Sequence, residues 1–493
     1  MAPNVILINC DDLGYGDLGC YGSTVNRTPH LNRMAEEGLR FTDFYAPSPV
    51  CSPSRAAMLT GCYPTRVGFG GQASGGLGGV LFPGWSVGLN PNEITIARLL
   101  SDAGYATKLV GKWHCGDQPE FLPTAHGFDE YYGIPYSNDM GRQVPSDNPD
   151  RPTDEQVEEM IRDRGCTEPW IRPPLPLLDG DAVLEAQPDQ AALTGRYLEQ
   201  AVRFVRQHRD GPFFLYLAHL YVHLPIYVQE RFRKESDNGD YGAAVACIDW
   251  VTGVLLAELA ALGIDEDTVV MFTSDNGALA DHRGGSGSNA PLRGAKGSTW
   301  EGGQRVPFLV RWPGRIPAGE ERSQVTSAID LLPTIAGLCD LAVPQDRVLD
   351  GTDLRPLLED KRVSAEPDDD VPDPGGGWDP DREFVYFQGG GPEAIRVGPW
   401  KLHVARRGSE RQELYHLGRD IGETEDVSEA NPEVVADLAA RLVRVRDALG
   451  DERLGIEGRE VREIGRVDDP VPLTVFDPDH PYFMAEYDLP HRG

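Results

Sequence analysis

The chain has 493 residues, of which 40% are hydrophobic and 25% charged, and its mean hydropathy is −0.37. These ordinary globular values give no support to a multi-span membrane protein. The length allows two or three average domains, or one large α/β unit with a smaller appendage. The net charge of −32 disfavours nucleic acids and anionic membrane surfaces as partners, because a strong negative excess repels polyanions.

The start of the chain predicts a strand. Met1–Asn4 has no basic region and passes directly into Val5–Asn9, which is too short for a signal-peptide core and fits a buried strand. No stretch is expected to approach the roughly 20 apolar residues of a membrane helix. We therefore expect a cytoplasmic protein without a membrane partner. Eight scattered cysteines without a CxxC pair predict neither a disulfide framework nor a zinc site.

Apolar runs alternate with helical patterns along the first three quarters of the chain. The expected strands are Val5–Asn9, Ala106–Val110, Phe213–Leu217, Thr268–Phe272 and Pro307–Val310. The expected helices are Pro29–Glu37, Glu93–Leu100, Tyr197–Val205 and Ala243–Leu262. This alternation predicts an α/β fold with a large, mostly parallel sheet flanked by helices.

A Gly- and Asp-rich connector, Ser364–Asp381, predicts a boundary between a catalytic domain (1–375) and a smaller subdomain with a tail (376–493). The runs beyond it predict a small antiparallel α+β unit. Its expected strands are Phe384–Phe387, Ala394–Val397, Trp400–Val404 and Glu413–Tyr415, followed by an amphipathic helix over Glu433–Leu449.

Charged residues follow four of the expected strands. Ligands of open α/β sheets bind outside the carboxyl ends of the strands, so these residues are candidates for one site. They are Asp11 and Asp12, Lys112 and His114, His219 and His223, and Asp275 and Asn276. Each group taken alone also fits an ordinary turn or helix cap, but together they place acids and cations along one edge of one sheet.

The acidic group is a candidate metal site. Three carboxylates and one amide oxygen (Asp11, Asp12, Asp275 and Asn276) form a hard oxygen set, for which calcium is the better match and magnesium or manganese are alternatives. Two unrelated turns explain the same residues equally well. His219 and His223 are four residues apart, but a zinc pair at that spacing needs a helix, and Pro225 argues against one.

Cys51 begins the segment Cys-Ser-Pro-Ser-Arg and is expected at the start of a short helix, with Arg55 one turn further on the same face. A helix start favours an anion, so a thiolate nucleophile is possible there. A cysteine phosphatase, however, has five residues between its cysteine and arginine, and here there are three. Considered alone, the segment predicts a buried cysteine before a capped helix.

Two long motifs resemble those of a known family. Cys51–Arg55 followed by Ala56–Gly61, and Gly104–His114, resemble the signatures of the type I sulfatases, in the arylsulfatase branch of the alkaline-phosphatase superfamily. The likeness continues through Arg396–Lys401 and Glu413–Tyr415.

The resemblance implies that a maturation enzyme, a transient partner, oxidises Cys51 to formylglycine, which hydrates to a geminal diol. One diol oxygen would attack the sulfur of a sulfate ester and form a covalent enzyme sulfate. The second oxygen would then expel the sulfate.

The resemblance also implies roles for single residues. Asp11, Asp12, Asp275, Asn276 and the modified Cys51 would bind one calcium ion. Arg55 would hold a diol oxygen, Lys112 and His114 would flank the formylglycine, and His114 would act as the base for sulfate release. His223 and Lys296 would contact the sulfate and could protonate the leaving oxygen, and Ser137 would lie near the substrate.

The expected activity is therefore hydrolysis of a small aryl sulfate ester. The alternatives are a phosphonate or phosphate monoester hydrolase on the same scaffold, and a catalytically silent calcium-stabilised binding protein. Salt screens exposed charges beyond about 8 Å, so nearby cations outweigh the global charge at the site. The acidic surface still argues against long sulfated polysaccharides. Gly70–Gly88 and Pro145–Pro188 are the loops expected to form the alcohol pocket.

Overall fold

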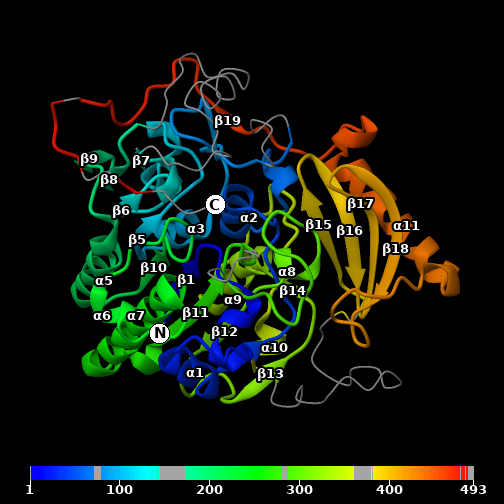
Figure 1. Ribbon diagram of the computed structural model, residues 1–493, viewed down its shortest axis with the longest axis horizontal. Helices are drawn as coiled ribbons and strands as arrows, with labels where there is room; N and C mark the ends of the chain where they lie inside the picture. Colours follow the sequence, from blue (N-terminus) through cyan, green and yellow to red (C-terminus); the bar gives the residue numbers. More distant parts are fainter. Residues whose placement is uncertain are drawn as a thin grey trace.

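The computed structural model describes residues 2–71, 79–141, 143–144, 173–279, 287–359, 379, 381–477, 479–482 and 485–486. Its main feature is a ten-stranded sheet in the order β13-β2-β12-β11-β1-β10-β5-β6-β8-β9 (Figure 1). In chain order these strands are β1 (Asn4–Cys10), β2 (Leu39–Phe41), β5 (Ala106–Lys112), β6 (Glu130–Ile134), β8 (Pro176–Asp179), β9 (Ala182–Ala186), β10 (Phe213–Ala218), β11 (Thr268–Ser274), β12 (Phe308–Arg311) and β13 (Glu320–Arg322).

The centre of the sheet is parallel. Strands β11, β1, β10, β5 and β6 pair in parallel, whereas β12 runs antiparallel to β11 and β2, and β8 and β9 form an antiparallel edge. The expected α/β class with a large sheet is confirmed. The parallel centre brings the carboxyl ends of β1, β5, β10 and β11 to one edge of the sheet, where the polar residues that follow them meet.

Helices cover both faces of the sheet. One layer contains α1 (Pro29–Glu36), α5 (Gln190–Gln207) and α7 (Gly239–Leu262), and the other contains α2 (Cys51–Thr60), α3 (Ile96–Asp102) and α9 (Leu331–Leu338). Successive residues of β1 serve the two layers, because side chains of a strand alternate between its faces: Ile6 packs in the first core and Leu7 in the second. The short helices are α6 (Glu230–Arg233), α8 (Glu301–Gln304) and α10 (Arg355–Glu359).

The expected helix at Glu93–Leu100 begins later than the pattern indicated. It starts at Ile96, because the Thr95 hydroxyl accepts a hydrogen bond from the Arg98 backbone N–H at 3.0 Å and caps the helix. The same hydroxyl donates to the His126 carbonyl at 2.6 Å, which ties the start of α3 to a neighbouring loop. The other expected helices are present, and two of them are longer than the pattern indicated.

By length and composition, α7 could cross a membrane: it has 24 residues, and the mean hydropathy of its most apolar window is 1.8. The expectation that no stretch approaches such a composition is therefore wrong. The reason is that α7 lies between α1, α5 and α6 and buries residues on several sides, as the core helix of a large α/β unit does.

The C-terminal part forms a separate four-stranded antiparallel sheet, β15 (Glu383–Gln388), β16 (Gly391–Val397), β17 (Trp400–Arg406) and β18 (Ser409–His416). Helix α11 (Pro432–Leu449) packs on its outer face (Figure 1). The expected small α+β unit is thus present, while the boundary at 375/376 lies outside the described residues and stays a prediction. The described residues also form three two-stranded pairs: β3 (Phe44–Tyr45) with β14 (Thr326–Ser327), β4 (Val87–Gly88) with β19 (Gly465–Arg466), and β7 (Gln143–Val144) with β20 (Ala485–Glu486).

Candidate active site

The residues at the carboxyl ends of β1, β5 and β11 lie together at one edge of the sheet, as the parallel pairing of its central strands requires. Asp11 and Asp12 follow β1, and Asp275 and Asn276 follow the adjacent β11; all four are buried. The Asn276 amide donates to Asp12 Oδ1 at 2.7 Å, and the Asp12 backbone N–H lies 3.3 Å from Asp275 Oδ1. Lys112, the last residue of β5, donates from Nζ to Asp11 Oδ2. Side chains at this edge of the sheet therefore connect the ends of β1, β5 and β11. The sequence had predicted only that each of them follows a strand.

Helix α2 brings Cys51 and Arg55 to this edge. Cys51 is its first residue and is 2% exposed, as the helix start in the sequence predicted. Arg55 is fully buried, and its guanidinium donates from Nε to Asp275 Oδ2 at 2.7 Å and from Nη1 to the Lys112 carbonyl at 2.9 Å. Burial lowers the pKa of Arg55, but Asp275 more than offsets this and holds it above its usual value, so Arg55 stays charged.

The residues fit a hard divalent cation. One ligand atom each from Asp11, Cys51 and Asp275 lies within 4.8 Å of the others. Asp11 Oδ1 and Asn276 Oδ1 are buried, and neither accepts a hydrogen bond from the described residues. Buried acceptors without donors are costly, and a cation would satisfy them. An oxygen-rich set of this kind suits calcium better than zinc.

Two lysines and a histidine surround the acids. Lys112 Nζ lies 3.3 Å from Ser137 Oγ, Lys296 Nζ donates to Asp12 Oδ2 at 2.8 Å, and His223 Nε2 lies 3.9 Å from the same Asp12 oxygen. Burial lowers the pKa of both lysines, but the carboxylates beside them, Asp11 and Asp12, raise it above the usual value. Both lysines therefore stay charged and can bind an oxyanion.

The two histidines are held in opposite tautomers. His114 Nε2 lies 3.0 Å from the Leu81 carbonyl, which can only accept, so Nε2 carries the proton. Nδ1 of His114 is buried without a partner among the described residues and is left as a proton acceptor. Burial lowers the pKa of His114 well below its usual value, and Lys112 and Arg55 lower it further, so the ring is neutral. In His223, Nδ1 donates to the Leu224 carbonyl, which turns Nε2 toward Asp12.

The segment that covers His114 belongs to Gly70–Gly88, which the sequence predicted only as a loop of the alcohol pocket; its contact with the His114 ring was missed. Leu81, whose carbonyl holds the ring, donates its own backbone N–H to Ser52 Oγ at 3.1 Å. The Gly84 backbone N–H donates to the buried Asp117 carboxylate at 2.6 Å. Ser52 lies within the Cys51 motif and could have been suspected, but nothing in the sequence marks a backbone carbonyl as functional. His219 is fully buried, and neither of its ring nitrogens has a hydrogen-bond partner among the described residues.

Asp117 should contribute a pH-dependent part of the stability. Burial raises its pKa from 3.8 to about 6, although hydrogen bonds from Gly84 and Gln118 lower it. The folded state therefore binds this proton more tightly than the unfolded state, so the contribution is complete below pH 3.8 and is lost as the pH rises to about 6. We expect the unfolding free energy of the native protein, relative to Asp117→Asn, to fall by about 3 kcal/mol over that range.

Urea titrations at several pH values measure this difference. Asp210→Asn is the control, since the Asp210 side chain is 91% exposed and the same charge change there should leave the pH dependence unaltered. A difference between native protein and Asp117→Asn that stays constant from pH 4 to 6 would contradict the prediction.

Comparison with known proteins adds to this geometry. A family model described as Sulfatase matches residues 3–341. Steryl-sulfatase of Rattus norvegicus is 40% identical over 407 residues, which cover 72% of this chain and 70% of that protein. Arylsulfatase A of Homo sapiens is 37% identical over 472 residues, covering 88% and 86%.

Solved structures agree. The sulfatase PsFucS1 from Pseudoalteromonas sp. is 26% identical, with a TM-score of 0.77, and the match covers 94% of this chain and 92% of that chain. The phosphonate monoester hydrolase of Agrobacterium radiobacter is 21% identical, with a TM-score of 0.58 and coverage of 90% and 95%. At that identity the likeness concerns the fold alone.

Proposed function

Since this chain belongs to the sulfatase family, we propose that it hydrolyses a small aryl sulfate ester to the alcohol and inorganic sulfate. The observation that carries the proposal is the meeting of Lys112, Lys296 and His223 with the buried acids next to Cys51. Two charged lysines beside a nucleophile position form a receptor for a tetrahedral oxyanion. The relatives support a sulfuric ester hydrolase, and the aryl ester is our finer assignment.

Cys51 itself argues for a modified residue. Burial raises the pKa of its thiol to about 11, although Lys112 and Lys296 lower it, so an unmodified thiol would be a poor nucleophile at neutral pH. The thiolate that the helix start made possible is therefore disfavoured. We propose formylglycine at this position, whose geminal diol supplies one oxygen to attack sulfur and a second to release the sulfate. A calcium ion held by Asp11, Asp12, Asp275, Asn276 and residue 51 would polarise a sulfate oxygen.

The surrounding residues orient and deprotonate the nucleophile. Arg55 and Lys112 place positive charge beside residue 51, where they favour an ionised oxygen. His114 is neutral, and its Nδ1 is available to accept a proton. We propose that it removes the proton from the second hydroxyl of residue 51 during release of the sulfate.

Lys296 and His223 lie on the side of Asp12 and would serve the leaving group. The ammonium of Lys296 and Nε2 of His223 can contact the sulfate. Lys296 can donate a proton to the departing oxygen, and His223 can do so from Nε2 when its ring carries both protons, because its Nδ1 proton is held by the Leu224 carbonyl. Ser137 Oγ lies 3.3 Å from Lys112 Nζ and 3.4 Å from His223 Nδ1, so it connects the two sides of the anion site. Ser137 is therefore proposed to position the substrate.

The test begins with residue 51. Mass spectrometry of the tryptic peptide that carries it, from protein made in its native cell, should show formylglycine, and finding only unmodified cysteine would refute the proposed nucleophile.

Steady-state rates on paired aryl sulfate and aryl phosphonate esters should favour the sulfate. A preference for the phosphonate would instead support the second candidate, a phosphonate or phosphate monoester hydrolase on the same scaffold. Calcium binding without turnover of either ester would indicate a catalytically silent binding protein.

The expected small-molecule substrate, the maturation enzyme and the cytoplasmic location stay predictions.

A further inference from the structure

Lys296, the lysine proposed to serve the leaving group, is carried by a loop, Arg293–Glu301, which we call the Lys296 loop. Two backbone hydrogen bonds tie it to the catalytic side: the Lys296 N–H donates to the Ala278 carbonyl at 3.0 Å, and the Gly297 N–H donates to the Pro49 carbonyl at 2.9 Å. Pro49 lies two residues before Cys51. The loop thus sits against both the end of β11 and the start of α2.

The opposite side of this loop is held by the C-terminal sheet. Gln388, the last residue of β15, donates from Nε2 to the Gly297 carbonyl at 2.6 Å. Glu393, on β16, accepts from the Thr299 hydroxyl at 2.9 Å. The second sheet therefore holds the loop at its central residue, Gly297, and again two residues later at Thr299, and the Gln388 contact falls on the residue next to Lys296.

A buried ion cluster fixes the end of the loop. The Glu301 carboxylate lies 2.9 Å from Lys401 Nζ, which lies 2.9 Å from Glu423 Oε1, and these three side chains are fully buried. The Glu301 backbone N–H donates to the other Glu423 oxygen at 2.8 Å. Burial raises the pKa of Glu301, but Lys401 and two arginines more than offset it and keep the carboxylate ionised. The loop end therefore has one rigid attachment to the second sheet.

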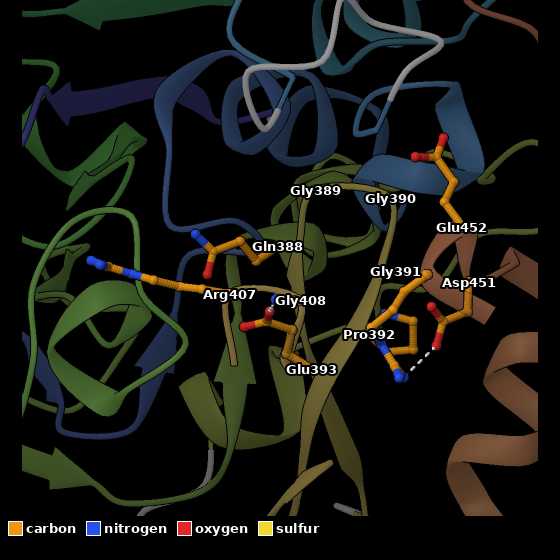
Figure 2. Close-up of a pocket in the computed structure, with 11 residues that line it drawn as sticks. Gln388, Gly389, Gly390, Gly391, Pro392, Glu393, Arg407, Gly408, Asp451 and Glu452 are labelled. Carbon is orange, nitrogen blue, oxygen red and sulfur yellow. Dashed lines mark hydrogen bonds and ion pairs between the residues drawn. The ribbon is translucent and has the colours of Figure 1, made fainter. Parts of the chain in front are cut away.

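The hydrogen bond from Gln388 to the Gly297 carbonyl is the contact of this loop that mutation can test best. Gln388 and Glu393 line a cavity of about 330 Å³ beside the turn between β15 and β16, and Figure 2 shows both side chains at this turn. Gln388 is only half-buried, so an apolar side chain of similar size can replace it without opening the core.

We infer that Gln388 is a positioning residue for the reaction: its amide holds the Gly297 carbonyl and thereby sets where the Lys296 ammonium meets the leaving oxygen. The inference rests on the proposed function. The Lys296 side chain is held at both ends, by the loop backbone and by Asp12 Oδ2, which lies 2.8 Å from its ammonium, so a shift of the backbone changes how the ammonium lies against the substrate. A small displacement of such a group costs much of the rate, because reacting atoms must be aligned closely.

The test is a double-mutant cycle of Gln388→Leu with Lys296→Ala, using fully modified protein. We expect Gln388→Leu to lower kcat about tenfold on phenyl sulfate and less on 4-nitrophenyl sulfate, whose leaving group needs a proton less. In the Lys296→Ala background the same change should cost less than about twofold, because the two residues act as one unit. A loss that is equal in both backgrounds, or equal for both esters, would overturn the inference.

Gln345→Leu is the matched control. Gln345 is exposed, and its amide also donates to a backbone carbonyl, that of Val343 at 3.0 Å, far along the chain from the site. It should leave kcat unchanged and change the thermal midpoint little, because exposed side chains contribute little to stability. An equal loss of kcat in this control would count against a specific role for Gln388.

A second measurement separates this inference from the proposed function. Inorganic sulfate binding, followed by calorimetry, should weaken severalfold in Gln388→Leu but not further when Lys296 is already alanine. If the native protein hydrolyses no sulfate ester, the proposed function fails while this binding cycle still tests the contact. Unchanged sulfate affinity in Gln388→Leu would overturn the positioning role.

Discussion

Replacing Cys51 by serine is expected to abolish multiple turnover, with a loss of about 10⁴-fold or more in kcat on an aryl sulfate. A serine at this position has one hydroxyl. It could accept the sulfuryl group, but it would have no second hydroxyl with which to expel sulfate, so the reaction would stop after one sulfuryl transfer to the enzyme. The fold should remain, because Cys51 is the first residue of α2, a position at which serine is well tolerated. Steady-state kinetics and intact-mass measurement after substrate addition check both parts.

Cys247→Ser is the matched control. Cys247 is buried in α7 and is not among the residues of the candidate site, and it receives the same change of sulfur to oxygen. It should retain kcat. Sustained multiple turnover by Cys51→Ser, at a rate near that of the native protein, would refute the two-hydroxyl mechanism.

The second large effect is expected from Asp275→Asn and concerns the cation. Calcium at about 1,000 times its dissociation constant should stabilise the native protein by about 4 kcal/mol, and chelation should remove this gain. Asp275→Asn should lose most of it, because the site would give up one carboxylate of the buried set formed with Asp11 and Cys51. Activity should fall about 10³-fold, because a bound cation acting as a Lewis acid stabilises the charge of the transition state by several kcal/mol.

Thermal unfolding with and without calcium measures the stability part independently of activity. The asparagine oxygen can still accept from Arg55 Nε, so the fold should persist in the variant. Asp210→Asn makes the same charge change at an exposed position and should keep the full calcium effect. A calcium-dependent gain of native size in Asp275→Asn would show that Asp275 does not hold the ion.

The local structure around the site could be read from the sequence. Apolar runs predicted β1, β5, β10 and β11 because a strand buried on both faces needs nearly continuous apolar residues. The segment Cys51–Arg55 predicted a short helix with Cys51 at its start, and the structure places Cys51 there, as the first residue of α2. That Asp11, Lys112 and Asp275 share one edge followed from a general property of parallel strands.

The strand order and the antiparallel members of the sheet could not be read in this way. Pro307–Val310 was expected as a strand and is present as β12, but its direction depends on pairing with both β11 and β2. The strands β2 and β13 were missed because each has only three residues, too few for a pattern. Pairing between distant segments depends on the sum of many tertiary contacts, which a local pattern does not contain.

The sequence by itself determined the chemistry that is present: the acids and cations at the strand ends, the Cys51 motif, and the family that these motifs resemble. Only the tertiary structure decided how they act together. It showed that Arg55 pairs with Asp275, that the Leu81 carbonyl fixes the tautomer of His114, and that Gln388 reaches the loop of Lys296. The reason is physical: residue type and spacing are local properties, whereas hydrogen bonds across long separations and the burial that shifts each pKa exist only once the chain has packed.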